Sequence, residues 1–189
     1  MANVKKNTRE SLVKKAVEMV KERGIDSLGI RSFAEYAGIS TQPVYLNFGN
    51  FQGLKEAVIS EINDLYEDFS KKEIEKSKYP PYKASGIAYV NFARVHPELF
   101  KILFMRSRKG EATKKADEYF DEKAREVSNN LGLEEKKARD FHFLMWVIVH
   151  GMATQIATDY LSIDEETVSE VLTKAYTALA DKNPNRTRL

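Results

Sequence analysis

Four polar side chains follow one another at helical spacing in a short segment of the chain. They are Thr41, Gln42, Tyr45 and Asn47, within the sequence RSFAEYAGISTQPVYLNF that spans residues 31–48. The Gln42 amide can make a paired donor–acceptor contact to adenine, and Thr41 can meet a thymine methyl group or a phosphate. Tyr45 and Asn47 suit phosphate oxygens, which orient a protein on DNA without specifying the sequence. The segment therefore predicts a surface that binds duplex DNA.

Two short helices are needed to position these side chains. The apolar spacing predicts a helix from Ile30 to Ala37, and Gly38 follows where the chain must turn sharply. Ser40 suits the N-cap of a second helix that runs to about Phe48. A helix held in this way fits the major groove with its N-terminal residues at base edges. Helix-turn-helix geometry also occurs in proteins that never contact DNA, so a helical protein-interaction module without DNA binding is the alternative.

The N-terminal segment is basic, although the whole chain has a formal charge of only +2. Residues 1–15 contain five basic side chains against Glu10 alone: Lys5, Lys6, Arg9, Lys14 and Lys15. A cationic segment favours a polyanionic partner through phosphate contacts and counterion release. A solvated terminus that aids solubility explains the same residues equally well.

Several classes of protein are disfavoured by what the sequence lacks. It has no cysteine, which excludes disulfides, thiolate zinc sites and cysteine nucleophiles. The first residues are charged, and the longest apolar stretch, 141–153, is too short to span a bilayer, so we expect a cytoplasmic protein without a membrane segment. There is no HExxH pattern, phosphate-binding glycine loop or nucleophile elbow. We therefore expect no catalytic site, metal or cofactor, and a small cytosolic enzyme is the weaker alternative.

The hydrophobic periodicity predicts an all-α fold, because apolar residues recur at three- and four-residue intervals and no alternating strand pattern is seen. We expect a three-helix, DNA-binding helix-turn-helix head that a long helix, 51–76, joins to a helical bundle for ligand binding and dimerisation. The further helices are expected at about 82–95, 97–106, 112–129, 134–160 and 164–181. We place a DNA-binding domain at 1–50 and a ligand-binding and dimerisation domain at 51–189.

Residues 9–58 resemble the N-terminal domain of TetR-family transcriptional regulators. The shared features are the turn Phe33-Ala34-x-x-Ala37-Gly38-Ile39-Ser40, the pair Tyr45-x-x-Phe48, and Leu54 and Ala57 in the same register. From the spacing and this resemblance, we assign DNA contacts to Arg31, Ser40, Thr41, Gln42, Pro43, Tyr45, Asn47 and Lys55. Two positions depart from the family pattern: Gly29 stands where a threonine usually caps the second helix, and Phe51 where a lysine usually meets a phosphate.

The second half of the chain resembles the ligand-binding region of a TetR subgroup, the WHG-type C-terminal domain. The resemblance lies in Tyr89-Val90-Asn91-Phe92-Ala93, His96-Pro97-Glu98-Leu99-Phe100, Trp146 and His150-Gly151. It implies a cavity for a small apolar or amphipathic effector. The candidate lining residues are Tyr89, Phe92, Phe104, Met105, Tyr119, Trp146, His150 and Thr154. Each of these aromatic and apolar residues, taken singly, also fits an ordinary helical core.

The stretch 141–157 is apolar on nearly all sides, which is too much for a helix with one solvent-facing side. Gly151 and Ala153 would let another helix approach closely. We expect a homodimer formed through two copies of the helices near 134–160 and 164–181, which would also match a two-fold DNA operator. Deep burial within one chain is the alternative. The hypothesis is a repressor that a small hydrophobic molecule releases from its double-stranded DNA operator.

Overall fold

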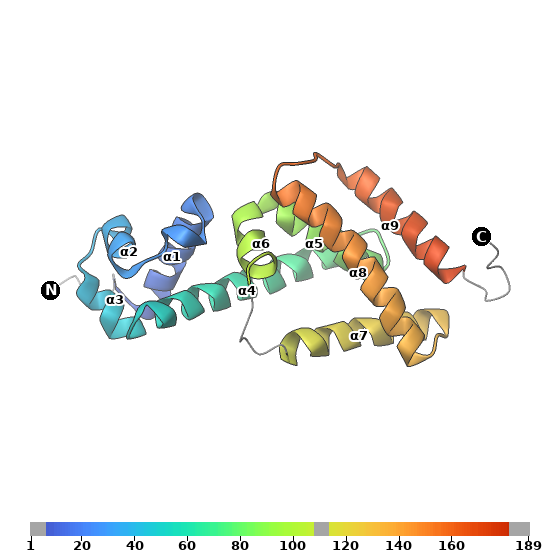
Figure 1. Ribbon diagram of the computed structural model, residues 1–189, viewed down its shortest axis with the longest axis horizontal. Coiled ribbons are helices and arrows are strands. Elements are labelled where there is room, and N and C mark those ends of the chain that lie inside the picture. Colours follow the sequence, from blue (N-terminus) through green and yellow to red (C-terminus); the bar gives the residue numbers. More distant parts are fainter. Residues whose placement is uncertain (1–6, 108–113, 182–189) are drawn as a thin grey trace. The chain divides into compact units, whose positions relative to one another are not determined.

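The computed structural model describes residues 7–107 and 114–181, and this part of the chain is helical with no strand (Figure 1). Lys5, Lys6 and the first residues of the helix expected at 112–129 lie outside it. The helices are α1 (Arg9–Arg23), a 3-10 turn η1 (Ile25–Ser27), α2 (Ile30–Ala37), α3 (Thr41–Phe48), α4 (Phe51–Lys76), α5 (Pro81–Val95), α6 (Pro97–Phe104), α7 (Lys114–Leu131), α8 (Glu135–Ala157) and α9 (Glu165–Ala180). The predicted all-α fold is confirmed. No described helix is long and apolar enough to cross a bilayer.

Most helix ends lie within two or three residues of their predicted positions, and the differences have local causes. α8 ends at Ala157 rather than 160, because Asp159 takes a positive φ of 54° and the chain turns there. Asp164 was expected inside the last helix but is its N-cap, with the side chain accepting a hydrogen bond of 2.7 Å from the Thr167 backbone N–H. This bond lowers the pKa of the Asp164 carboxyl. The turn η1 was not predicted.

The first compact unit comprises residues 1–69 and 95–106. In it α1 contacts α2, α3 and α6, around a core that includes the fully buried side chains of Phe33, Val44 and Leu54. α6 belongs to this unit because Phe104 packs edge-on against Tyr66 of α4, with ring centroids 5.1 Å apart. The unit therefore differs from the expected domain 1–50: it also contains the first part of α4 and all of α6.

The second unit comprises residues 70–94 and 107–189, and holds most of α5 with α7, α8 and α9. Phe92 and Val90 of α5 are fully buried in its core. The buried Asn91 amide donates hydrogen bonds of 3.3 Å to carboxylates of Glu73 and Glu165, and Arg94 donates to the Asn91 side-chain oxygen. This polar cluster joins α5 to the last turns of α4 and the start of α9, so buried polar atoms here have partners.

Candidate functional site

The turn between α2 and α3 is built on Gly38, which has left-handed backbone angles of φ 67° and ψ 36°. Its N–H and that of Ile39 bond back to the last turn of α2, with a distance of 3.0 Å from Ile39 N to Ala34 O. Glycine adopts this conformation without the steric cost of a Cβ. Lys15 of α1 donates a hydrogen bond of 3.1 Å to the Ala37 carbonyl. The predicted helix-turn-helix is therefore present, and Lys15, expected as part of a cationic arm, helps to end α2.

α3 is anchored by Val44 and Phe48, which are buried against the rest of the unit. Gln42 is exposed, and 51% of Tyr45 is exposed. Leu46 is 77% exposed and was not singled out from the sequence. Because residues three and four apart lie on one side of a helix, Gln42, Tyr45 and Leu46 share the outward face of α3.

The other predicted contacts on α3 are less open. Thr41 and Pro43 are half-buried, whereas Ser40 is exposed at the N-cap, without a capping hydrogen bond from its side chain. Asn47, for which a phosphate contact was predicted, is half-buried. Its side-chain nitrogen donates hydrogen bonds of 2.8 Å to the Pro43 carbonyl and 3.4 Å to the Asn7 carbonyl. The side-chain nitrogen of Asn47 is therefore engaged with two backbone carbonyls.

The residues that flank α3 match the sequence in several respects. Arg31 is exposed in the first turn of α2, and Gly29 occupies the N-cap of that helix without a side-chain bond, as predicted. Phe51 begins α4 and is partly exposed, while Lys55 lies one turn later and is half-buried. The Arg9 guanidinium lies over the Phe48 ring, 5.4 Å from its centroid.

Gly53 marks a close approach that sequence reasoning missed. A Cβ built on it would stand 2.2 Å from the backbone oxygen of Phe48, a distance that side chains cannot tolerate. The Gly53 N–H also bonds to the Asn50 side chain at 2.9 Å. α4 therefore begins directly against the end of α3, which fixes the geometry between these two helices.

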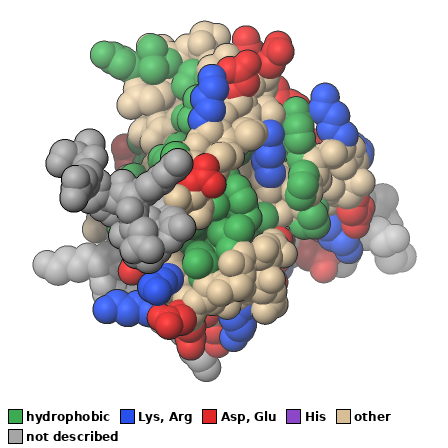
Figure 2. All heavy atoms as spheres, turned by 90° about the vertical axis from the view of Figure 1, so that its right-hand side faces the viewer, with side chains coloured by type: hydrophobic (Ala, Val, Ile, Leu, Met, Phe, Trp, Pro, Cys, Tyr) green, Lys and Arg blue, Asp and Glu red, His purple; other side chains and the backbone are tan. Residues whose placement is uncertain are grey.

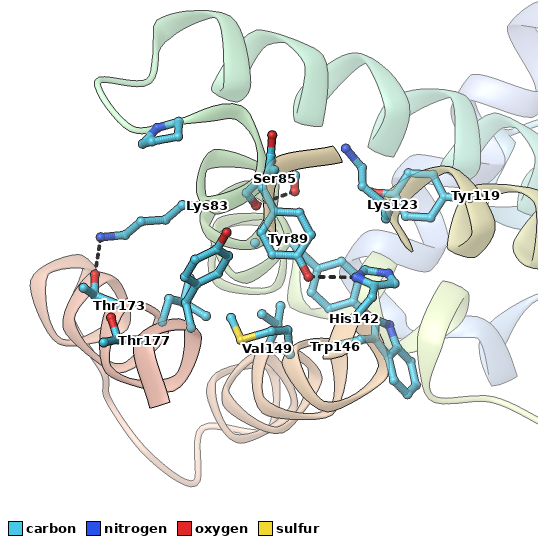
Figure 3. A pocket seen from close by; sticks show the side chains of 17 residues that line it. Lys83, Ser85, Tyr89, Tyr119, Lys123, His142, Trp146, Val149, Thr173 and Thr177 are labelled. Atoms are coloured by element: carbon cyan, nitrogen blue, oxygen red, sulfur yellow. Dashed lines mark hydrogen bonds between the residues drawn. The ribbon is translucent and has the colours of Figure 1, made fainter. Parts of the chain in front are cut away.

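The second unit contains a largely apolar cavity of about 280 Å³ between α5, α7, α8 and α9 (Figure 3). Aromatic and aliphatic side chains dominate its walls, as in most small-molecule sites. Its lining comprises Pro80, Tyr82, Lys83, Ser85, Gly86, Tyr89, Tyr119, Lys123, Asn130, His142, Met145, Trp146, Val149, Leu172, Thr173, Tyr176 and Thr177. Tyr89, Tyr119 and Trp146 were among the predicted ligand residues, and the structure brings these three together here.

A tyrosine–histidine pair, half-buried at Tyr82 and buried at His142, forms part of the wall. The Tyr82 hydroxyl lies 2.9 Å from His142 Nδ1, within hydrogen-bond distance. Burial lowers the pKa of His142 to about 4, helped by the positive charge of Lys123 and opposed by Glu126. Burial also raises the pKa of the Tyr82 hydroxyl. At neutral pH both groups are therefore uncharged, and the wall binds through hydrogen bonds and aromatic contacts.

The remaining predicted ligand residues do not line this cavity. Phe92 is fully buried in the core of the second unit, while Phe104 and Met105 belong to the first unit, where Phe104 packs on Tyr66. Thr154 is half-buried on α8 and lies outside the lining. His150 is not in the lining either, but its Nδ1 lies 2.9 Å from the Tyr89 hydroxyl.

The cavity residues that were missed had a signal in the sequence. His142, Met145 and Val149 share with Trp146 one side of α8 at three- and four-residue spacing. No ligand contact was predicted for His142. Tyr82 lies 60 residues away along the chain. A pairing over that distance leaves no trace in local periodicity.

These features define a class of all-helical protein, with a helix-turn-helix in one unit and a cavity-bearing helical bundle in the other. Residues 82–187, more than half of the chain, match the family model described as the tetracyclin repressor-like, C-terminal domain. The chain belongs to the TetR family of transcriptional regulators, as its sequence resemblance predicted.

Curated relatives and solved structures agree with this assignment. The tetracycline repressor protein class D of Escherichia coli is 29% identical over 102 residues, which cover 54% of this chain and 42% of that protein. The match thus spans less than half the length of this curated relative. A TetR-like transcriptional regulator from Rhodococcus sp. RHA1 has a TM-score of 0.70 at 16% identity, covering 92% of this chain and 97% of its own. A TetR variant from Acinetobacter baumannii AYE in complex with minocycline has a TM-score of 0.59 at 13% identity, covering 96% and 99%. These two structures share the fold.

Proposed function

We propose that this protein is a dimeric, cytoplasmic regulator that binds an operator in double-stranded DNA and releases it when a small molecule occupies the cavity. The observation that carries the proposal is the outward face of α3. Gln42 and Tyr45 are exposed on a helix whose opposite side is anchored by Val44 and Phe48. A short helix fixed from behind and polar in front has the geometry that major-groove reading requires.

The outward face divides into base-reading and backbone-binding groups. Gln42 can pair with an adenine edge, and Leu46 can contact a thymine methyl group. The Tyr45 hydroxyl, Arg31 and Lys55 suit phosphate oxygens. Lys55 is the nearest cation along α4 to the position where the family usually has lysine and this chain has Phe51. We infer that Lys55 supplies the backbone contact that Phe51 cannot make.

Dimerisation through α8 and α9 is supported by apolar side chains at the surface of α8. Apolar side chains reach the surface between charged ones on one face of the molecule (Figure 2). On α8, Phe143, Leu144 and Val147 are all exposed, and a Cβ at Gly151 would meet open space. Such a stripe of apolar residues is typical of an interface. A two-fold dimer would present two copies of α3 to two half-sites of an operator.

Two helices can couple the cavity to DNA. α4 begins against α3 at Gly53 and continues into the second unit, and α8 contributes both cavity lining and the exposed apolar stripe. A ligand that favours one arrangement of these helices changes the affinity for the operator. Because this is binding linkage, the operator must weaken the ligand by the same factor as the ligand weakens the operator.

The DNA-binding proposal is tested with a duplex selected from a random pool by the purified protein. Fluorescence anisotropy over a range of salt concentrations should show an affinity that falls as salt rises. Tyr45→Ala should weaken binding to every sequence, and Lys55→Met should weaken it and make the salt dependence shallower by about one phosphate contact. Lys72→Met is the control, because Lys72 is exposed on the part of α4 that belongs to the second unit and lies outside α3, α8 and α9.

Two results would overturn this proposal. One is a protein that selects no duplex, which is what a helical protein-interaction module predicts. The other is equal affinity for the wild type, Tyr45→Ala and Lys55→Met. For the dimer, sedimentation at micromolar concentration should give twice the 21.6 kDa mass of the chain, and a persistent monomer would contradict the assignment of α8 and α9.

A further inference from the structure

The cavity in the second unit carries positive charge at its edges and no negative charge in its walls. Two lysines, Lys83 and Lys123, are among the described residues that line it, and none of those residues is an aspartate or glutamate. Lys83 lies at one side with Thr173 and Thr177, and Lys123 lies at the other with Tyr119 (Figure 3). The two lysines differ in what surrounds them, and this difference indicates where a charged group of a ligand would bind.

Lys123 is already neutralised. Its ammonium lies 2.9 Å from a Glu126 carboxylate oxygen, and both side chains are largely shielded from solvent. The negative charge of Glu126 also shifts the pKa values of Tyr82 and His142 upward, and for His142 this opposes the larger lowering effect of burial. This side of the cavity therefore offers neutral hydrogen-bonding groups and little net charge.

Lys83 has no such partner. Its ammonium donates a hydrogen bond of 2.8 Å to the Thr173 hydroxyl oxygen and lies 4.3 Å from the centroid of the Tyr79 ring. Neither group carries a charge, and no carboxylate of the described residues lies within ion-pair distance. The Thr173 hydroxyl donates to the Ser169 carbonyl at 2.9 Å, so it serves Lys83 as an acceptor. An ammonium has three donors, which leaves Lys83 able to bind an anion at the edge of the cavity.

We propose that the effector is an organic monoanion with an aromatic or bulky apolar body. Its acid group binds Lys83, with the nearby Thr177 hydroxyl as a second donor, and its body lies against Tyr82, Met145 and Leu172. This deepens the proposed function by naming the chemical class of ligand for the same cavity. Aromatic walls alone would also suit a cation, but a cation here would face the ammonium of Lys83, and none of the described lining residues is a carboxylate that could pair with it. The charge of the walls decides between the two classes.

Three probes that share a 4-tert-butylphenyl ring and differ in charge test the proposal. They are the anion 4-tert-butylbenzoate, the neutral 4-tert-butylbenzamide and the cation 4-tert-butylbenzylammonium. Isothermal titration calorimetry of the full chain, without DNA, should show the carboxylate binding at least about tenfold more tightly than the amide, a factor that corresponds to 1.4 kcal/mol. The ammonium should bind more weakly than the amide. Lys83→Met should bring the carboxylate to within about threefold of the amide and leave the amide affinity unchanged. Lys72→Met, which removes an exposed lysine of α4 that is not among the lining residues, should retain the wild-type order.

Several results would overturn the proposal: tightest binding of the ammonium, a carboxylate preference that survives in Lys83→Met, or no binding of any probe at millimolar concentration. Thermal unfolding of both variants shows whether a loss of binding reflects a loss of folding. The role of Lys83 is refuted if Lys83→Met unfolds at the wild-type midpoint and keeps the wild-type preference for the carboxylate. Because no DNA is present, failure here is distinct from failure of operator binding by α3.

Discussion

Acidification is expected to destabilise the second unit through one buried histidine. His142 is 7% exposed, its Nδ1 lies 2.9 Å from the Tyr82 hydroxyl, and its ring centroid lies 4.5 Å from that of Phe120. Burial, with a further contribution from Lys123, lowers its pKa from 6.5 to about 4. The folded state therefore keeps His142 neutral, while the unfolded chain takes up a proton near pH 6.5. The stability associated with this group is present above about pH 6.5 and is lost as the pH falls toward 4.

The size of this loss follows from the pKa shift. The full change from 6.5 to about 4 corresponds to an upper limit of roughly 3 kcal/mol in the free energy of unfolding. Between pH 7 and pH 5 the same linkage predicts a loss of about 2 kcal/mol. Below about pH 4 both states are protonated and this contribution levels off.

Urea unfolding at pH 7 and pH 5, at fixed protein concentration and ionic strength, measures the effect. Trp146 is the only tryptophan in the chain and lies in the second unit, so its fluorescence reports on that unit, with circular dichroism as a second probe. His142→Gln replaces the imidazole with an amide that can still form hydrogen bonds but cannot titrate. The wild type should lose about 2 kcal/mol more than this variant between the two pH values. Equal losses in the two proteins would refute the assignment of the pH dependence to His142.

Three further substitutions have outcomes that the structure predicts. Gly53→Ala should force α4 away from the Phe48 carbonyl and so weaken DNA binding. It should also lower the free energy of unfolding by roughly 1–3 kcal/mol. Unchanged urea unfolding would contradict the close approach of the two helices. Phe92→Ala should cost about 3–5 kcal/mol in urea unfolding because the ring is fully buried; a loss below about 1 kcal/mol would show that the ring is not core. Val147→Glu should convert the dimer to monomers in sedimentation while circular dichroism stays unchanged, and a dimer that persists would place the interface elsewhere.

The helix-turn-helix could be predicted from the sequence because its determinants are local. Gly38 allows the left-handed turn, and Gly29 and Ser40 hold the N-cap positions of α2 and α3. Each of these features depends on residues within one or two turns of the same helix. Helical periodicity located the long helix α4 for the same reason.

Contacts between distant residues could not be predicted in this way. Asn47 was predicted only as a DNA contact, and its amide nitrogen also donates to the carbonyl of Asn7, 40 residues away. Lys15 caps α2 across 22 residues. Phe104 and Met105 are apolar on a short helix, and periodicity cannot say which of two cores such a helix joins. The structure places them with the first unit, apart from the cavity they were expected to line.

The claim that α3 reads DNA is tested most directly by a loss-of-contact measurement on Gln42. Operator affinities are compared for wild type and Gln42→Ala, on the selected duplex and on duplexes that each carry one substituted base pair. We expect the wild type to discriminate against substitution of one A·T pair in each half-site by about 1–3 kcal/mol, and Gln42→Ala to lose that discrimination at that pair alone. Discrimination by Gln42→Ala that equals the wild type at every base pair would contradict the proposed reading helix.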